Sequence, residues 1–369
     1  MAFKRMNTRS QYQHGGSPQL DLARFDLQER AVLDFSVNLN YLGPPAIIRK
    51  KWMEILEKIE SYPSVEGDGV AHYYQKKFGI SSQNFLSGNG STELIYLVPR
   101  VLRFKHVVII TPSYHDYERA SILAGARVTR FPISFESKFS FPDMNKLSEA
   151  LKNADALWLG RPNNPTGTLF PKEPLLELAS KFQDKWFIFD EAFIQFADKW
   201  KENSFLVDQP RSNLLVIHSL TKFYALAGLR LGGIAGAEED ISRLREAKEP
   251  WTVNGVADYV APLLLGCGDY EHETRVKIKA ERERNFIRLE KLGGFTPFPS
   301  STNFIFCQWN KTNSLDDLMG HLLSHGVYVR DCRNFPGLGK SFFRIGLRSP
   351  NENDKLMSIL SSFQGGFRG

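Results

Sequence analysis

Hydrophobic and polar positions in the middle of the chain alternate between short apolar runs and longer stretches with helical spacing. The apolar runs are rich in β-branched and aromatic residues and predict strands at 107–111, 128–131, 156–159, 186–190, 214–219 and 231–235. The stretches between them predict helices at 91–102, 116–124, 144–152 and 173–181. Strands that alternate with helices predict an α/β fold, with a mostly parallel central sheet and helices on both faces.

After Pro250 the pattern changes. Two long amphipathic stretches at 254–264 and 270–292 are followed by shorter apolar runs at 303–308, 327–329 and 342–347. We therefore expect a smaller α+β domain at the C-terminal end. The predicted division is an N-terminal arm (1–45) that packs on the small domain, a large domain (46–249) and a small domain (250–369).

Length and charge limit the classes of protein that fit this pattern. A chain of 369 residues is long enough for two packed lobes. The net charge of +6 is a mild bias and includes no basic block of the nucleic-acid-binding type. No apolar run is long enough for a membrane span, so neither nucleic acid nor a membrane is an expected partner. An anionic small molecule is the favoured ligand, and a solvated basic surface is the alternative.

The cysteines Cys267, Cys307 and Cys332 are scattered and have no metal-ligand spacing. We interpret them as reduced thiols of a cytoplasmic protein and expect no metal site. The N-terminus has no apolar core of the kind found in signal peptides, which agrees with that interpretation.

Polar motifs follow the ends of the predicted strands, where parallel sheets bind their ligands. Asp190 ends a very apolar run, and a charge there is costly unless a cation faces it. The protonated ring nitrogen of pyridoxal phosphate is one candidate, whereas a helix N-cap or a buried salt bridge is the alternative. Lys222 follows the next strand, and its amine could bond to a carbonyl carbon. A single strand-end lysine is usually a surface charge, but the two successive strand ends favour a shared site.

Three further turns support a cofactor site. Asn164 lies in a proline-fixed turn that could point its amide at a ring oxygen. The glycine-rich segment from Ser87 to Glu93 opens a helix, and its N–H groups could hold a phosphate. Ser219, Thr221 and Arg230 could add charge-assisted bonds to the same phosphate. Tyr114 could stack on a ring, although packing in the core or at the rim fits equally well.

The motifs Asn164-Pro-Thr-Gly, Asp190-Glu-Ala-Phe and Ser219-Leu-Thr-Lys222, in this order, resemble fold-type I pyridoxal-phosphate enzymes. The chain is most similar to the branch that contains histidinol-phosphate aminotransferase and L-threonine-O-3-phosphate decarboxylase. Segments near both ends favour the decarboxylase, among them 34–40, 250–254 and 330–338. The resemblance extends from about residue 14 to residue 360.

The resemblance implies a role for each matching residue. Lys222 would bond to the cofactor aldehyde, Asp190 would pair with its ring nitrogen, Asn164 would meet its ring oxygen and Tyr114 would stack on it. The cofactor phosphate would be held by Gly90, Ser91, Ser219 and Arg230, with Tyr62 reaching across from a second subunit of a homodimer. Arg344 would bind the substrate carboxylate, and the substrate phosphate would be held by His14, Asn38 and Arg330.

The implied reaction is decarboxylation of L-threonine O-3-phosphate to (R)-1-amino-2-propanol O-2-phosphate, for cobalamin assembly. The substrate phosphate would set which bond at the α-carbon stands perpendicular to the ring and therefore breaks. Alternatives are decarboxylation of L-serine O-phosphate, transamination of histidinol phosphate, and a cofactor-binding domain without enzymatic activity. Such a domain has no need for Arg330 and Arg344 together.

Arg161 and Arg333 depart from the family pattern. Each is interpreted as a surface arginine, and either would alter the preferred substrate if it faced the cleft.

Overall fold

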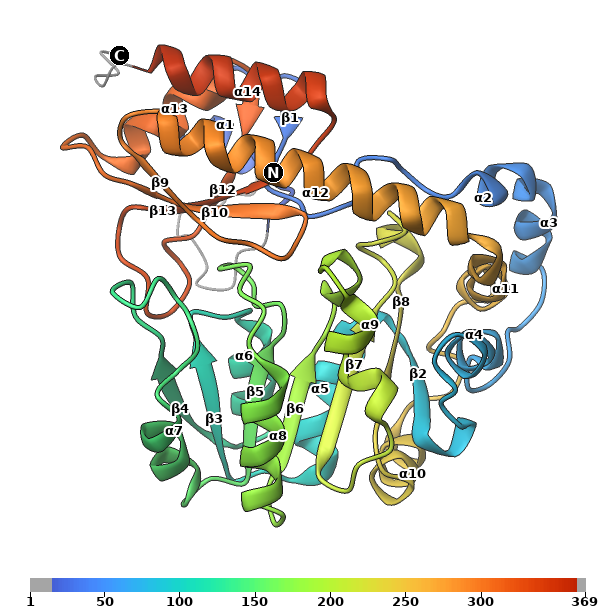
Figure 1. Ribbon diagram of the computed structural model, residues 1–369. Helices are drawn as coiled ribbons and strands as arrows, with labels where there is room; N and C mark the ends of the chain where they lie inside the picture. Colours follow the sequence, from blue (N-terminus) through green and yellow to red (C-terminus); the bar gives the residue numbers. More distant parts are fainter. Residues whose placement is uncertain (1–14, 364–369) are drawn as a thin grey trace, which may run out of the picture.

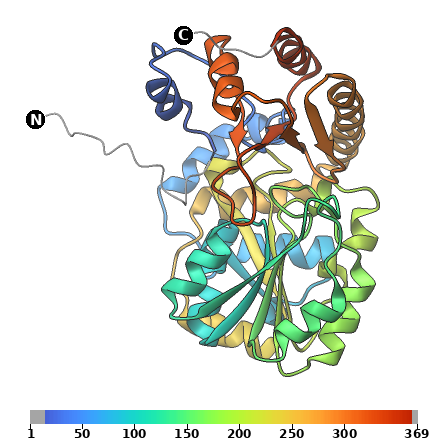
Figure 2. The same cartoon turned by 90° about the vertical axis from the view of Figure 1, so that its left-hand side faces the viewer.

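The computed structural model describes residues 15–363 of the chain. A larger lobe is built on a seven-stranded sheet, and a smaller lobe carries a four-stranded sheet (Figure 1). Figure 2 shows the smaller lobe placed over one edge of the large sheet. The predicted α/β class with an additional α+β unit is confirmed.

The strands of the large sheet lie in the order β2-β8-β7-β6-β5-β3-β4. Their bounds are β2 (Phe85–Asn89), β8 (Leu231–Ala235), β7 (Leu214–Ser219), β6 (Trp186–Asp190), β5 (Ala156–Gly160), β3 (His106–Thr111) and β4 (Arg127–Pro132). Strand β8 is antiparallel to both of its neighbours, and the other pairs are parallel. The segment between β7 and β8 contains only a short 3-10 turn, which is too little chain for the crossover that a parallel strand needs.

Alternate side chains of the central strands enter two separate hydrophobic cores, one on each face of the sheet. Phe187 and Phe189 belong to one core, and Ile188 between them belongs to the other. This two-residue period is the signature of a strand buried on both faces.

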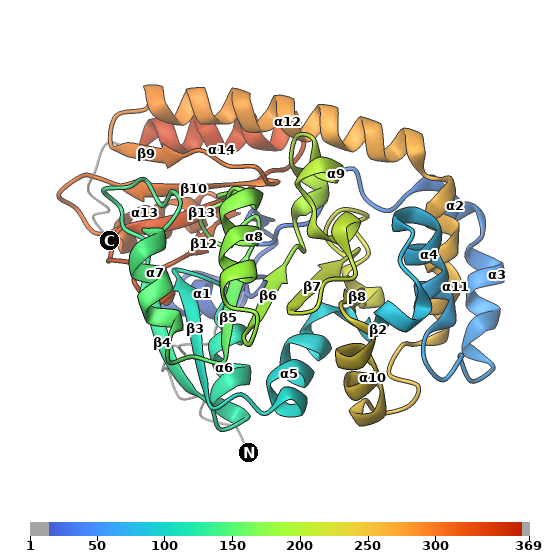
Figure 3. The same cartoon turned by 60° about the horizontal axis from the view of Figure 1, so that its bottom comes forward.

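Helices cover both faces of this sheet. One face carries α5 (Gly90–Leu102), α6 (Asp116–Leu123) and α10 (Glu238–Ala247), and the opposite face carries α7 (Met144–Leu151) and α8 (Lys172–Lys181) (Figure 3). Because β2, β3, β5, β6 and β7 run in one direction, the loops that follow them open at one edge of the sheet. The predicted polar motifs lie in these loops.

The smaller lobe is antiparallel, with strands in the order β12-β13-β10-β9. The bounds are β9 (Phe295–Phe298), β10 (Phe304–Trp309), β12 (Arg330–Asp331) and β13 (Phe342–Gly346), with helices α12 (Gly268–Lys291), α13 (Leu315–Ser324) and α14 (Pro350–Ser362). Each of the two helices α13 and α14 begins with a capping box.

The N-terminal segment crosses from one lobe to the other. It contains α1 (Pro18–Arg24), β1 (Leu33–Asp34), α2 (Ala46–Lys50) and α3 (Trp52–Leu56). Strand β1 pairs in parallel with β11 (Val327–Tyr328) of the smaller lobe. Helix α11 (Gly255–Leu263) packs on α4 (Asp68–Phe78), where Asp258 accepts a hydrogen bond of 2.7 Å from the Gly69 N–H. The domain boundaries drawn from the sequence remain a prediction.

Strands β2 and β9 have no counterpart among the predicted elements. Gly88 and Pro297 interrupt their apolar patterns, and both residue types are depleted in strands. Within residues 15–363, no helix combines the length and apolar character that crossing a membrane would require.

Candidate active site

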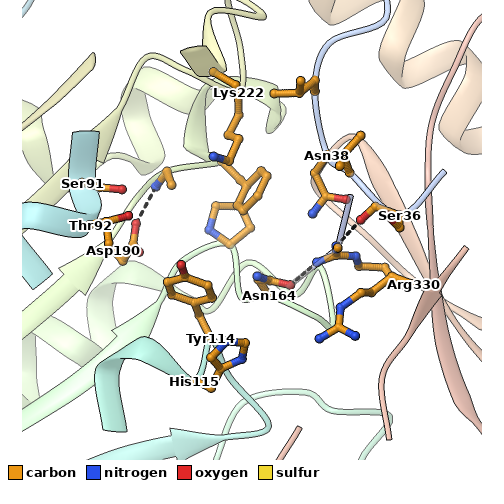
Figure 4. A pocket seen from close by; sticks show the side chains of 18 of the residues that line it. Ser36, Asn38, Ser91, Thr92, Tyr114, His115, Asn164, Asp190, Lys222 and Arg330 are labelled. Atoms are coloured by element: carbon orange, nitrogen blue, oxygen red, sulfur yellow. Dashed lines mark hydrogen bonds between the residues drawn. The ribbon is translucent and has the colours of Figure 1, made fainter. Parts of the chain in front are cut away.

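A cavity of about 270 Å³ lies where the loops at the carboxyl edge of the large sheet face the smaller lobe (Figure 4). Most of the residues singled out from the sequence line this cavity. They are Asn38, Ser91, Tyr114, Asn164, Asp190, Lys222, Arg230, Arg330 and Arg344. Residues from the N-terminal segment, the large sheet and the small sheet therefore meet in one place.

Three other predicted site residues lie within the described part of the chain and do not line the cavity: Tyr62, Gly90 and Ser219. Gly90 and Ser219 lie directly beside it in the chain, next to Ser91 and to the lysine loop. Tyr62 is 85% exposed, and its ring lies 5.4 Å from that of Trp251 on the outer surface. His14 lies outside the described residues. These roles remain predictions.

Lys222 extends from the loop after β7 into the cavity (Figure 4). Its Nζ donates a 3.3 Å hydrogen bond to Oγ1 of Thr221, and that hydroxyl lies 2.7 Å from Oγ of Ser219. Removal from bulk water, together with the nearby positive charges of Arg230 and Arg344, lowers the pKa of Lys222 to about 8. A larger fraction of the amine is thus neutral at physiological pH than in an ordinary lysine, and only the neutral amine is nucleophilic.

Asp190 ends β6, where it is buried and lines the cavity. The Tyr117 hydroxyl donates to Oδ2 at 2.8 Å, and the Ala192 N–H donates to Oδ1 at 2.9 Å. Burial raises the pKa of Asp190, whereas these two hydrogen bonds oppose that effect. A cation bound in the cavity would complete the stabilisation of this carboxylate.

The N-terminus of α5 and Arg230 form a cationic corner of the cavity. Gly90 has φ +71°, and a Cβ atom there would collide with the guanidinium of Arg230. Nη2 of Arg230 lies 3.4 Å from Oγ1 of Thr92, which lines the cavity with Ser91. Helix N–H groups, two hydroxyls and an arginine are a donor set suited to a phosphate.

The opposite wall is supplied by the smaller lobe and the N-terminal segment. Arg344 of β13 donates through Nη1 to Oδ1 of Asn164 and through Nη2 to the Ser36 carbonyl at 2.9 Å. Burial lowers the pKa of Arg344 to about 10, so the guanidinium stays cationic at neutral pH. Among the described residues, the buried Oδ1 of Asn38 has no hydrogen-bond partner. Polar groups of this kind are available to a ligand.

The surface interpretation of Arg161 is wrong. Its side chain is fully buried behind the site and lies 3.3 Å from Oε1 of Glu191, while Nε donates to the Phe170 carbonyl at 2.7 Å. Arg333 forms ion pairs with Asp331 and Asp316. Neither arginine lines the cavity, so neither selects the substrate by direct contact.

Several residues of the site carry no signal in the sequence. Tyr117 comes three residues after Tyr114, and its position in the sequence is typical of a packing residue. Its ring stacks on that of Trp158, with the two ring centroids 5.2 Å apart. Thr92 lies within the glycine-rich motif, where nothing in the sequence distinguishes its hydroxyl from that of Ser91. Ser36, His115 and Phe335 line the cavity only because distant segments meet there. No group of three potential metal ligands is found in the part of the chain that the structure describes.

Comparison with known proteins identifies the class to which this arrangement belongs. The family model for aminotransferases of class I and II matches residues 30–360. The chain belongs to this family. A likeness to solved structures agrees: the histidinol-phosphate aminotransferase from Clostridium acetobutylicum has a TM-score of 0.83 and 30% identity, with 89% of this chain and 98% of that chain covered.

Two curated relatives of this class I and II family member are not named as aminotransferases. Threonine-phosphate decarboxylase of Salmonella typhimurium is 31% identical over 94% of this chain and 95% of the relative. The adenosylcobalamin biosynthesis bifunctional protein CobDQ of Leptospira interrogans is 32% identical over 96% of this chain. The chain spans 41% of the length of that bifunctional relative.

Proposed function

We propose that this family member is a pyridoxal-phosphate-dependent decarboxylase of L-threonine O-3-phosphate. Its product would be (R)-1-amino-2-propanol O-2-phosphate, for use in cobalamin biosynthesis. The single observation that carries the proposal is the division of charge across one cavity. Lys222 and Asp190 lie on the large-sheet side, and Arg330 and Arg344 face them from the small sheet.

The groups on the large-sheet side fit pyridoxal phosphate. Lys222 offers an amine whose lowered pKa makes its nucleophilic form more accessible, and a pyridinium nitrogen would add a cationic partner for the buried Asp190. The corner of Ser91, Thr92 and Arg230 matches the phosphate, and the ring of Tyr114 borders the space between. When bound, the cofactor supplies a sink for the electron pair of the bond that breaks at the substrate α-carbon.

The residues on the other side would bind and orient the substrate. Arg344 is held by Asn164 and the Ser36 carbonyl, so its guanidinium is fixed for a carboxylate. Arg330 and Asn38, whose buried Oδ1 has no hydrogen-bond partner among the described residues, line the part of the cavity that we assign to the substrate's own phosphate. Two fixed anchors set the rotation of the α-carbon and so decide which of its bonds is broken.

Lys222 would have a second task when the cofactor is bound. Its lowered pKa would allow it to hold or donate a proton near neutral pH, as protonation of the product α-carbon requires. Ser36, Val37 and Asn38 of the N-terminal segment line the same cavity.

Two other activities use the same cofactor groups. A histidinol-phosphate-type aminotransferase is the second candidate, because the solved structure with 30% identity carries that name. Decarboxylation of L-serine O-phosphate is the third. This substrate differs from L-threonine O-3-phosphate only in lacking the methyl group at the β-carbon.

The test is to incubate the purified, cofactor-loaded enzyme with L-threonine O-3-phosphate and no keto acid. We expect release of carbon dioxide and formation of the amino-alcohol phosphate. Turnover that requires 2-oxoglutarate and conserves all the carbon would establish the aminotransferase instead. The ratio of kcat/KM for the threonine and serine phosphates then separates the two decarboxylases.

We also propose a cytoplasmic homodimer with shared active sites. Large apolar side chains are exposed along one strip, which we call the α3 strip: Trp52, Met53, Leu56, Ile59, Tyr62 and Val65. Large apolar side chains exposed so close together in the chain are typical of a protein interface. Tyr62 belongs to the strip, from which it could reach the cofactor phosphate of a second subunit. The three cysteines are free, which suits a reducing compartment.

A further inference from the structure

His115 follows Tyr114 directly and lines the cavity, yet none of the assigned roles uses it. Its side chain is only 4% exposed. It occupies the N-cap position of α6 but makes no capping hydrogen bond to that helix. The position of its ring is therefore not explained by the start of the helix.

Two aromatic neighbours place His115 at the far end of the cavity. Its ring centroid lies 5.3 Å from that of Tyr114 and 6.0 Å from that of Phe335. The guanidinium of Arg330 lies over the same Phe335 ring, at 5.1 Å. In Figure 4, His115 and Arg330 both border the end opposite the backbone of Lys222. A large-lobe residue and a small-lobe residue thus flank the place assigned to the substrate phosphate.

Arg330 alone offers an incomplete set of donors there. Its Nη1 donates to the Asp331 carbonyl, and its Nη2 donates to Oδ1 of Asn334 at 2.8 Å. Bonds to its own loop fix the guanidinium but occupy donor directions on both terminal nitrogens. A phosphate ester has three terminal oxygens and about two negative charges, and it is bound best by several charge-assisted donors.

We propose that His115 is a specificity-determining residue that donates a hydrogen bond to the phosphate of the substrate. The inference rests on the proposed function for the identity of that phosphate. An imidazole ring has one N–H donor when neutral and two when cationic, so it can serve in either form. Its contact would favour phosphorylated amino acids over the same amino acids without phosphate.

The competing explanation is that His115 only packs against Tyr114 and Phe335. Two substitutions separate these roles. His115→Phe keeps an aromatic ring and removes the donor, whereas His115→Gln keeps an N–H donor and removes the ring. His272→Phe is the matched control, since His272 is exposed on α12 and lies outside the cavity.

Two measurements on the cofactor-loaded enzyme are compared across the variants. The first is the ratio of kcat/KM for L-threonine O-3-phosphate to that for L-threonine, and the second is the Kd of inorganic phosphate by calorimetry. For His115→Phe we expect the ratio to fall by about 10- to 100-fold and phosphate to bind correspondingly more weakly, the effect of losing one charge-assisted bond. For His115→Gln the loss should be several-fold smaller, and the control should match the wild type.

An equal loss with both substrates, or a larger loss in His115→Gln than in His115→Phe, would overturn the proposal in favour of packing. The absorbance of the bound cofactor verifies that each variant is folded. If the wild type releases no carbon dioxide from threonine phosphate, the proposed function is wrong. Phosphate binding still tests His115 in that case, because the α5 corner is filled by the cofactor.

Discussion

At the scale of single residues, the chemistry depends on the protonation of Lys222. Its pKa of about 8 means that the cofactor-free amine is mostly protonated at pH 6.5 and mostly neutral at pH 9.5. We expect the rate of covalent attachment of added pyridoxal phosphate to rise with pH and to level off above about 8.

Stopped-flow absorbance on the cofactor-free enzyme measures this rate. A rate that keeps climbing to pH 10 would indicate an ordinary lysine and contradict the argument. The Lys222→Ala variant provides the baseline, since it should show no covalent absorbance change at any pH.

Tyr117 lines the cavity and donates a hydrogen bond to Asp190, so we assign it a positioning role through that carboxylate. Its hydroxyl donates one of the two hydrogen bonds that lower the pKa of the buried Asp190 carboxylate. In Tyr117→Phe the pKa of Asp190 should rise, so the carboxylate is lost at a higher pH as the solution is acidified. We expect kcat/KM to fall by about 10-fold at neutral pH, and its acid limb to move to higher pH.

Tyr328→Phe is the control, because the Tyr328 hydroxyl also donates to a buried carboxylate, that of Asp21, at 2.8 Å. Tyr328 and Asp21 do not line the cavity, whereas Tyr117 does. A similar shift of the acid limb in both variants would show that the effect is general and not transmitted through Asp190.

At the scale of elements, the N-terminal segment holds the lysine loop. The Asn40 N–H donates to the Lys222 carbonyl at 3.1 Å, and its buried amide lies 2.9 Å from both the Phe223 carbonyl and the Thr274 hydroxyl. We expect Asn40→Ala to reduce the free energy of unfolding by about 1–3 kcal/mol and kcat by roughly 10-fold. Urea unfolding and steady-state kinetics measure the two effects.

Asn213→Ala is the matched comparison. The Asn213 amide also serves three acceptors, the carbonyls of Ala179, Phe182 and Lys185, but it lies away from the cavity. It should lose similar stability and keep its kcat. If both variants lose activity equally, Asn40 stabilises the fold without positioning Lys222.

Elements with a strong local pattern could be predicted from the sequence. The apolar run that ends abruptly at a charged residue predicts a strand at 186–190, and β6 has these bounds in the structure. The reversed direction of β8 was not foreseen, since it depends on the short path of the chain after Ser219. Of the site, the lysine, the carboxylate and the arginines of the small lobe were chosen from the sequence, and the structure brings them to one cavity.

The remaining residues could not be predicted for a physical reason. The burial of Arg161 depends on Glu191, and Glu191 depends in turn on Ser204 and the Phe205 N–H from a separate loop. A charged side chain is stable in the protein interior only when partners of this kind surround it. Contacts between distant segments leave no periodic signal in the chain.

At the scale of the whole molecule, the α3 strip leads to a prediction about assembly. Ile59 and Met53 are 68% and 70% exposed, which is unusual for large apolar side chains. If a second copy covers the strip, Ile59→Glu should convert a dimer to a monomer, because it would bury an unpaired charge at the interface. Sedimentation velocity at micromolar concentration measures the change.

Ile287→Glu is the control, since Ile287 is also half-exposed but lies on α12, away from the strip. It should leave the assembly as it is. A wild-type protein that sediments as a monomer would rule out the shared active site, and with it the role assigned to Tyr62.

The convergence of three separate stretches of chain on one cavity limits how the enzyme could be shortened. A fragment of residues 46–249 expressed alone would retain the reactive amine and the carboxylate opposite it. It would have lost Asn38, Arg330 and Arg344, and His115 alone would remain of the residues proposed to hold the substrate. Such a fragment could still capture the vitamin, but any small amine in the cell could then condense with it unselected.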